Sequence, residues 1–126
     1  MPTSRDLKNR GTISVHIAAA SIASDTTTNP SGGVDCSDLA SITFAVHTGN
    51  WIDGTFTPNL QESDDDSTYT EIASDNIIGT ETALGADNTV VSIGAHPQKK
   101  YARCQIVSTG TTSGSIIGVL AIAQSS

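Results

Sequence analysis

Residues 56–72 read FTPNLQESDDDSTYTEI and decide the fold, because they contain a complete β-hairpin. Phe56, Leu60 and Ile72 occupy alternating or near-alternating positions among polar residues, which is the pattern of strands with one buried face. The acidic residues 64–66 begin a polar turn between the two strands. The segment therefore predicts an antiparallel sheet with one face in water.

A second strand is predicted from the same alternation in residues 41–48. Ile42, Phe44 and Val46 alternate with small or polar residues, so we expect these three side chains in the core. His47 is then expected to point outward. The Gly49-Asn50 pair is expected to end the strand.

The strand nearest the N-terminus is predicted around residues 13–17. Ile13, Val15 and Ile17 alternate with polar residues, which places His16 on the opposite face from the three aliphatic side chains. The alanine-rich residues 18–23 continue this strand, although an alanine run is equally compatible with a helical turn.

The second half of the chain contains three more predicted strands, at residues 89–94, 101–108 and 115–123. Residues 109–114 are rich in Gly and Thr, so we interpret them as a hairpin loop that pairs the last two strands. Residues 116–123 are apolar at nearly every position, which predicts burial on both faces, either inside the domain or against another copy. We expect irregular connections at 25–33 and 75–88, the latter with a short helical turn.

These segments predict an all-β protein, an antiparallel β-sandwich of the jelly-roll or Ig-like type with about seven or eight strands. The 126 residues suffice for one domain, so we expect an extended arm at 1–12 and a single sandwich domain at 13–126. Only 15% of the residues are charged and 4% are aromatic, a composition that favours short strands joined by polar loops.

The formal charge of −7 is unevenly distributed along the chain. Arg5, Lys8 and Arg10 against Asp6 give the first ten residues a charge of +2, which leaves −9 for the remainder. An acidic body argues against nucleic acid as a partner, because phosphate binding requires a basic face. A basic arm on an acidic body suits an acidic protein surface or a neighbouring copy.

No run of apolar residues is long enough to cross a bilayer, and residues 1–5 lack the apolar core of a secretion signal. We therefore expect no membrane partner and synthesis in the cytoplasm. In that reducing compartment Cys36 and Cys104 are expected as two buried thiols, with a disulfide as the alternative.

Sequence patterns that carry chemistry are scarce. His16, His47 and His96 are isolated, so a zinc site is not expected. Residues 64–66 could offer carboxylates to Ca²⁺, but they lack the alternating spacing of a calcium loop, and a solvated turn is favoured. The chain also lacks a G-x-S-x-G elbow and a phosphate-binding glycine motif. We expect no catalytic residues, no cofactor and no enzymatic activity.

Three segments resemble one class of protein. Residues 60–72 carry an L-Q-E-S-D-D-x-S-x-Y-T-x-I hairpin, residues 1–9 read MPTSRDLKN, and residues 99–103 read KKYAR. These motifs are similar to those of small virion structural proteins of tailed bacteriophages, of the head decoration or cement type. Where that pattern has Gly after the acidic pair, this chain has Asp66, which leaves the turn type open.

The resemblance implies a capsid decoration protein that binds the exterior of the assembled head and stabilises it by bridging neighbouring major capsid protein subunits. It also implies a homo-oligomer, with a trimer favoured at local threefold positions. The residues that we expect to anchor the arm on the capsid are Arg5, Leu7, Lys8 and Arg10. Further surface contacts are expected from Trp51, Asp64, Asp65 and Asp66.

The alternative is a structural or binding module of a tail, neck or fibre, or a free carbohydrate-binding domain. In that case Trp51, Tyr69 or Tyr101 would stack on a sugar, although the whole chain contains only five aromatic residues from which to build such a site. For Trp51 the competing interpretation is a cap over one end of the sandwich.

Overall fold

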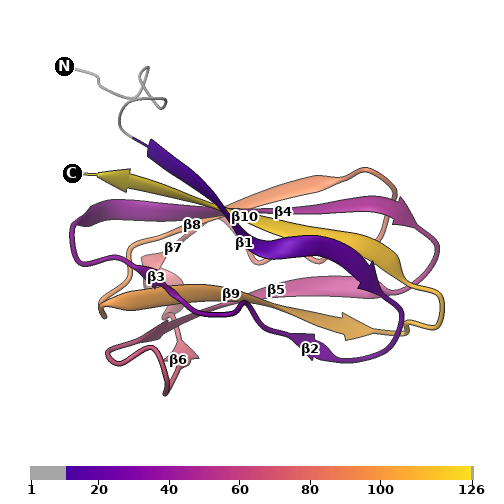
Figure 1. The fold of residues 1–126 in the computed structure, drawn as a ribbon, viewed down its shortest axis with the longest axis horizontal. Helices are drawn as coiled ribbons and strands as arrows, with labels where there is room; N and C mark the ends of the chain where they lie inside the picture. The colour runs from indigo at the N-terminus through magenta and orange to yellow at the C-terminus, as the bar shows by residue number, and fades with distance from the viewer. Residues whose placement is uncertain (1–10, 126) are drawn as a thin grey trace.

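A computed structural model describes residues 11–125 of the chain. Two antiparallel sheets pack face to face, and this confirms the predicted all-β sandwich (Figure 1). Sheet A has the strand order β1 (Gly11–Ile22), β10 (Ser115–Ser125), β4 (Leu39–Trp51), β8 (Val90–Ala95) and β7 (Ile77–Ile78). Sheet B has the order β2 (Thr27–Thr28), β9 (Tyr101–Thr109), β5 (Thr55–Ser63) and β6 (Thr70–Glu71), and β3 (Val34–Asp35) also pairs with β9. Of the four two-residue strands, β6 belongs to the predicted hairpin, and the other three are too short for alternation to indicate them.

The core lies between the inner faces of the two sheets. Ile42, Phe44 and Val46 of β4 are fully buried, as their alternation predicted. Strand β4 does not end at Gly49, as expected, but continues to Trp51. A side chain at Gly49 would be crowded, because Ile116 of the neighbouring β10 lies 3.3 Å from the position that a Cβ would take. Glycine avoids this contact within the strand.

Strand β1 departs from its predicted orientation. His16 is buried, whereas Ile13 and Val15 are 58% and 65% exposed. The register with β10 shifts between Val15 and Ile17, so that Ile17 opposes the buried Val119 and also packs against the core. This bulge breaks the strict alternation, which is why the three aliphatic residues do not share one face.

The last two long strands, β9 and β10, do not pair with each other. The hairpin predicted across residues 109–114 is therefore wrong. Strand β9 lies in sheet B and β10 lies in sheet A, so the loop between them crosses the sandwich (Figure 1). The carboxylate of Asp53 holds this loop, because it accepts the backbone N–H groups of Thr112, Ser113 and Gly114 at 2.8 to 3.1 Å. The hydrogen bond from the Thr112 hydroxyl, followed by these backbone bonds, lowers the pKa of Asp53 to about 2.

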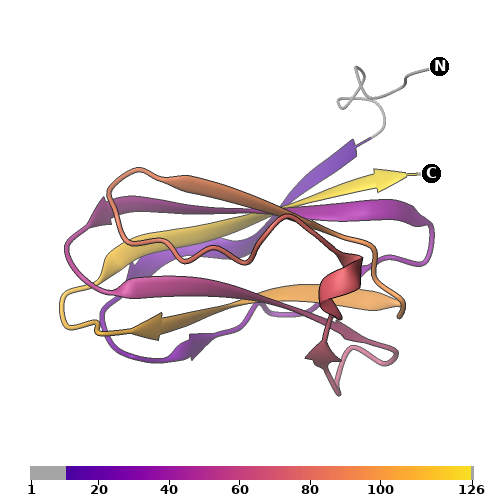
Figure 2. The same cartoon turned by 180° about the vertical axis from the view of Figure 1, so that it is seen from behind.

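The predicted hairpin at residues 56–72 is present, with Gln61 opposite Glu71 and Glu62 opposite Thr70. The chain then forms a 3₁₀ turn, η1 (Ser74–Asn76), and runs along one side of the sandwich before entering β8 (Figure 2). Along this path Leu84 is buried and exchanges two backbone hydrogen bonds with Phe56 of sheet B. The connection therefore closes one side of the core. No helix in residues 11–125 is both long and apolar enough to span a membrane.

Candidate binding surfaces

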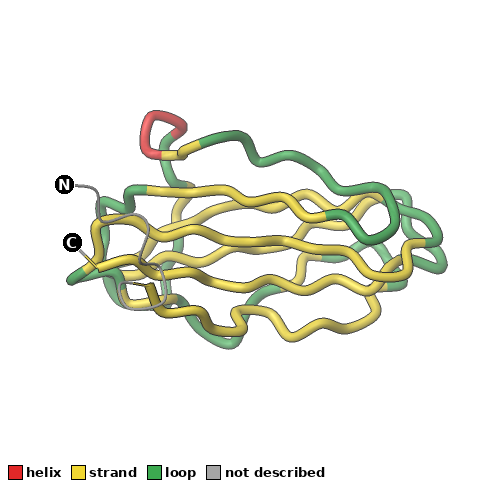
Figure 3. The backbone as a smooth tube through the Cα atoms, turned by 90° about the horizontal axis from the view of Figure 1, so that it is seen from above, coloured by secondary structure: helices red, strands yellow, loops and turns green. Residues whose placement is uncertain are grey.

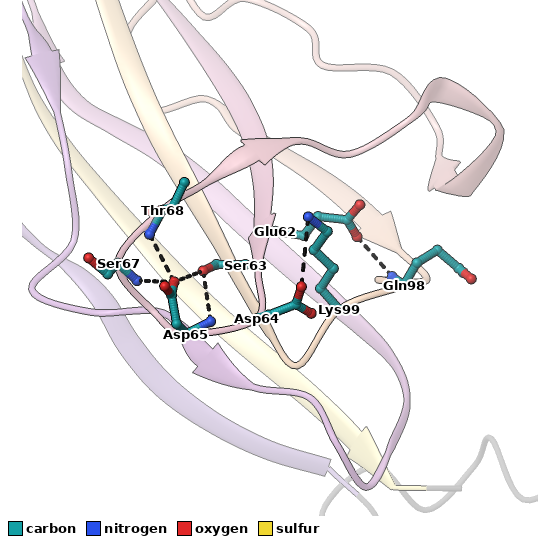
Figure 4. A network of polar contacts seen from close by, with 8 residues as sticks. All are labelled: Glu62, Ser63, Asp64, Asp65, Ser67, Thr68, Gln98 and Lys99. Atoms are coloured by element: carbon teal, nitrogen blue, oxygen red, sulfur yellow. Dashed lines mark hydrogen bonds and ion pairs between the residues drawn. The ribbon is translucent and has the colours of Figure 1, made fainter.

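The acidic turn is organised by Asp65 (Figure 4). Its Oδ1 atom accepts hydrogen bonds from the Ser63 hydroxyl at 2.9 Å and from the backbone N–H groups of Ser67 and Thr68 at 3.0 and 2.9 Å. The bond from Thr68 contributes most to lowering the pKa of this carboxyl. Asp65 is thus a turn-forming residue whose bonding capacity is largely used inside the loop.

Asp66, the residue at which the turn type was left open, has a left-handed backbone, with φ 58°. An Asp tolerates this conformation better than most residues, which explains how the turn forms without Gly. Its carboxylate accepts the Tyr69 hydroxyl and, at 2.8 Å, the backbone N–H of Gly33. Asp64 is the most outward of the three: its side chain is 77% exposed and forms an ion pair with the Lys99 ammonium, 4.0 Å away.

The three aromatic residues proposed for sugar stacking do not form one cluster, because Tyr69 lies near Tyr101 whereas Trp51 lies apart. Trp51 ends β4, donates its indole N–H to the Gly54 carbonyl at 2.9 Å and packs against the core, in the manner of an end cap. Tyr101 opposes Ser63 at the far end of β5. The nine residues of β5 separate these ends by roughly 25–30 Å.

The outer face of sheet B carries a network of polar side chains, here called the polar face. Its members are Asn29, Asn59, Gln61, Tyr69, Glu71, Arg103 and Gln105. The Arg103 guanidinium lies 4.0 Å from the centre of the Tyr69 ring and donates from Nε to Gln61 at 2.9 Å. The amide groups of the network hydrogen-bond one another, with Gln105 donating to Asn29 at 2.6 Å. These side chains are therefore satisfied without a ligand.

The outer face of sheet A is the opposite case, and we call it the apolar face. Its exposed large side chains are Ile13, Val15, Ile78, Val90 and Ile116. Cross-strand pairing places these residues in rows: Val15 opposes Leu120, which opposes Ala45, and Ile13 opposes Ile122 in the next row. Figure 3 shows the long strands of this sheet lying side by side beneath the viewer.

The ionisable side chains in the strands of sheet A are two histidines, His16 and His47. None of its five strands contains Asp, Glu, Lys or Arg, so every such residue within 11–125 belongs to sheet B or to a connecting segment. This feature was not recognised from the sequence, although it is visible there as long uncharged segments at 11–22, 39–51 and 115–125.

One buried polar group links the two sheets. The backbone N–H of Cys104 in β9 donates to Nε2 of His16 in β1 at 3.0 Å, and the imidazole packs on Phe44 with ring centroids 4.9 Å apart. Because Nε2 accepts this bond, His16 is neutral. Burial, with a smaller effect of Arg103, lowers its pKa to about 4.

The expected free thiols are confirmed, since Cys36 and Cys104 are unbonded and buried. Burial raises the pKa of Cys36 to about 11 and that of Cys104 to about 12. His47, as predicted, points to the outer side, opposite Val90 and Gly118.

The described part of the chain offers surfaces and no cavity: residues 11–125 contain no pocket and no group of His, Cys, Asp and Glu placed to hold a metal ion. The arm residues Arg5, Leu7, Lys8 and Arg10 lie outside the described residues. Comparison of the chain with protein-family models, with curated proteins and with solved structures found no match.

Proposed function

We propose that this chain is a bacteriophage capsid decoration protein, which binds the exterior of the assembled head and bridges neighbouring major capsid protein subunits. The resemblance of residues 1–9, 60–72 and 99–103 to phage virion proteins is the basis for the virion assignment. The observation that supports a binding role is the combination of two extended outer faces with no pocket in residues 11–125. Such a surface suits protein contacts better than turnover of a small substrate.

Decoration of a shell depends on many weak contacts made at once. Each copy would contribute its N-terminal segment, with Arg5, Lys8 and Arg10 facing acidic capsid surface. When several copies are joined, release requires all contacts to break together, so modest affinities give long residence. The bridged capsid subunits are stabilised because the bound protein favours the assembled shell.

Cryo-electron microscopy of particles assembled with and without this chain tests the proposal. We expect density in repeated copies on the shell exterior, in contact with more than one capsid subunit. Density restricted to the tail or neck would overturn the decoration proposal.

The arm is tested separately by deletion of residues 1–10, with an Arg5→Gln, Lys8→Gln, Arg10→Gln triple variant as a full-length control for charge. Both changes precede β1, so circular dichroism and the melting temperature should stay as in the wild type. Capsid binding should weaken in both variants, and more in the deletion. Unchanged binding in both would show that the arm is not a contact.

The alternative, a carbohydrate-binding module of a tail, neck or fibre, is favoured by one observation: Tyr69 and Arg103 stack beside amide side chains on the polar face. Aromatic rings and planar polar groups are the usual contacts of sugars. Glycan-array binding that is lost in Tyr69→Ala and kept in Trp51→Ala would support this alternative. Normal capsid association with no glycan signal would exclude it.

A further inference from the structure

The apolar face of sheet A is large enough to form a stable interface. Three long strands and the six-residue β8 lie side by side in it. With strands about 4.8 Å apart and a rise of about 3.3 Å per residue, the face covers about 600 Å². Two such faces packed together would bury about 1,200 Å², which reaches the range of specific protein interfaces.

The charge distribution indicates which partner fits this face. The residues from 11 onward have a formal charge of −9, and all of that charge lies in sheet B and the connections. Two copies that approached through any charged side would repel each other. Two copies that meet through sheet A place no carboxylate against another, and the apolar side chains lose their contact with water.

The chain's own N-terminal segment fits the apolar face of sheet A less well than a second copy does. Residues 1–10 read MPTSRDLKNR, in which Met1, Pro2 and Leu7 are the only large apolar residues and four are charged. Burial of those charges on an uncharged face would leave them unpaired, which is costly.

We propose that the apolar face of sheet A is covered by a second copy of this chain, with Leu120 and Ala45 near the centre of the contact and Val15 beside them on the edge strand β1. The face-to-face arrangement is self-complementary, as a twofold interface requires. This inference goes beyond the proposed function, because the interface would form in free protein whether or not the chain binds a capsid.

The test uses purified full-length protein in sedimentation velocity and light scattering between about 1 and 100 μM. We expect a dimer, with twice the 12.9 kDa mass of one copy, because a twofold contact joins two chains. Ile13→Lys is the test variant and Ile52→Lys is its matched control, because both isoleucines are 58% exposed and only Ile13 lies on sheet A. Val15→Lys tests the row in which Val15 lies beside Leu120 and Ala45.

Ile13→Lys and Val15→Lys should weaken self-association at least 10-fold, while Ile52→Lys should associate like the wild type. All three substitutions are at exposed positions, so the melting temperature of the monomeric state should change little. A wild-type protein that stays monomeric at 100 μM would overturn the inference, as would association that Val15→Lys leaves intact. If the wild type is monomeric and Val15→Lys abolishes capsid binding instead, the face belongs to the capsid protein. An oligomer that fails to bind capsids would refute only the proposed function.

Discussion

The two sheets of this sandwich have similar inner faces and opposite outer faces. Inside, Phe44 of sheet A and Phe56 of sheet B are both fully buried. Outside, sheet B presents amides and a stacked Arg103 that bond among themselves, whereas sheet A presents isoleucine and valine side chains and no charge. The fold itself needs only the inner faces, so the difference outside reflects what each sheet meets in solution.

The largest expected effect tests whether the inner faces are equivalent. Phe44→Ala and Phe56→Ala should each lower the free energy of unfolding by about 3–5 kcal/mol, because each removes a fully buried ring and leaves a cavity. Urea denaturation of both variants measures this. A loss below about 1 kcal/mol in one variant would show that its sheet is not part of a shared core.

The second prediction concerns the loop that crosses between the sheets after β9. A Cβ on Gly114 would lie 1.7 Å from the Ile22 carbonyl oxygen, and its φ is +76°, so Gly114→Ala should cost about 3 kcal/mol or more. Gly110 has φ +62° but nothing within 4 Å, so Gly110→Ala should cost only about 1 kcal/mol. Thermal denaturation compares the two. Equal losses would mean that the loop does not pass tightly against β1.

The third prediction uses His16, the hydrogen-bonded link between the sheets. Its pKa is about 4 in the folded protein against an ordinary 6.5, so the unfolded chain binds more protons between these values. The free energy of unfolding should therefore be highest above pH 6.5 and fall by on the order of 2–3 kcal/mol as the pH is lowered to about 4.

A His16→Gln variant is the control for this titration, because its side chain does not ionise. Its stability should vary less over the same pH range. The stabilisation from Asp53, whose pKa is lowered from 3.8 to about 2, is lost mainly below pH 4 but begins to fall near about pH 5, so the His16 effect is the difference between the two profiles. Identical pH profiles for the two proteins would contradict the role of His16.

The smallest effect compares the outer faces directly. Gln105→Ala removes two hydrogen bonds of the polar face and should cost about 1–1.5 kcal/mol. Ser92→Ala changes an exposed residue of sheet A and should stay within about 0.5 kcal/mol. Chemical denaturation at a concentration where the protein is monomeric measures both. Equal losses of stability in the two variants would show that the hydrogen bonds of the polar face do not distinguish it energetically from the outer face of sheet A.

The alternation of apolar and polar residues within single segments was sufficient to predict a buried strand face and a hairpin. The alternation of Ile42, Phe44 and Val46 correctly placed them in the core, and the polar run after Leu60 correctly marked a hairpin. A period of two says that residues share a face, but it does not say which face is inside. For that reason the orientation of Ile13 and Val15 was not predictable from their spacing.

Pairing between distant segments was the harder problem. A loop rich in Gly and Thr is common to hairpins and to crossings between sheets, so residues 109–114 alone did not distinguish them. The observed crossing is held by Asp53, which is about sixty residues earlier in the sequence and accepts hydrogen bonds from three backbone N–H groups of the loop. Likewise, Trp51 and Tyr101 were both candidates for a sugar site, but the structure places them near opposite ends of β5.

The two buried thiols give this protein a built-in reporter of its own opening. With pKa values of about 11 and 12, fewer than about one in a thousand of these groups is a thiolate at neutral pH, and neither is accessible. Maleimide or disulfide reagents should therefore modify Cys36 and Cys104 only when the surrounding strands separate. Labelling kinetics of the unmodified chain would then measure local breathing near β3 separately from separation of the sheets at β9.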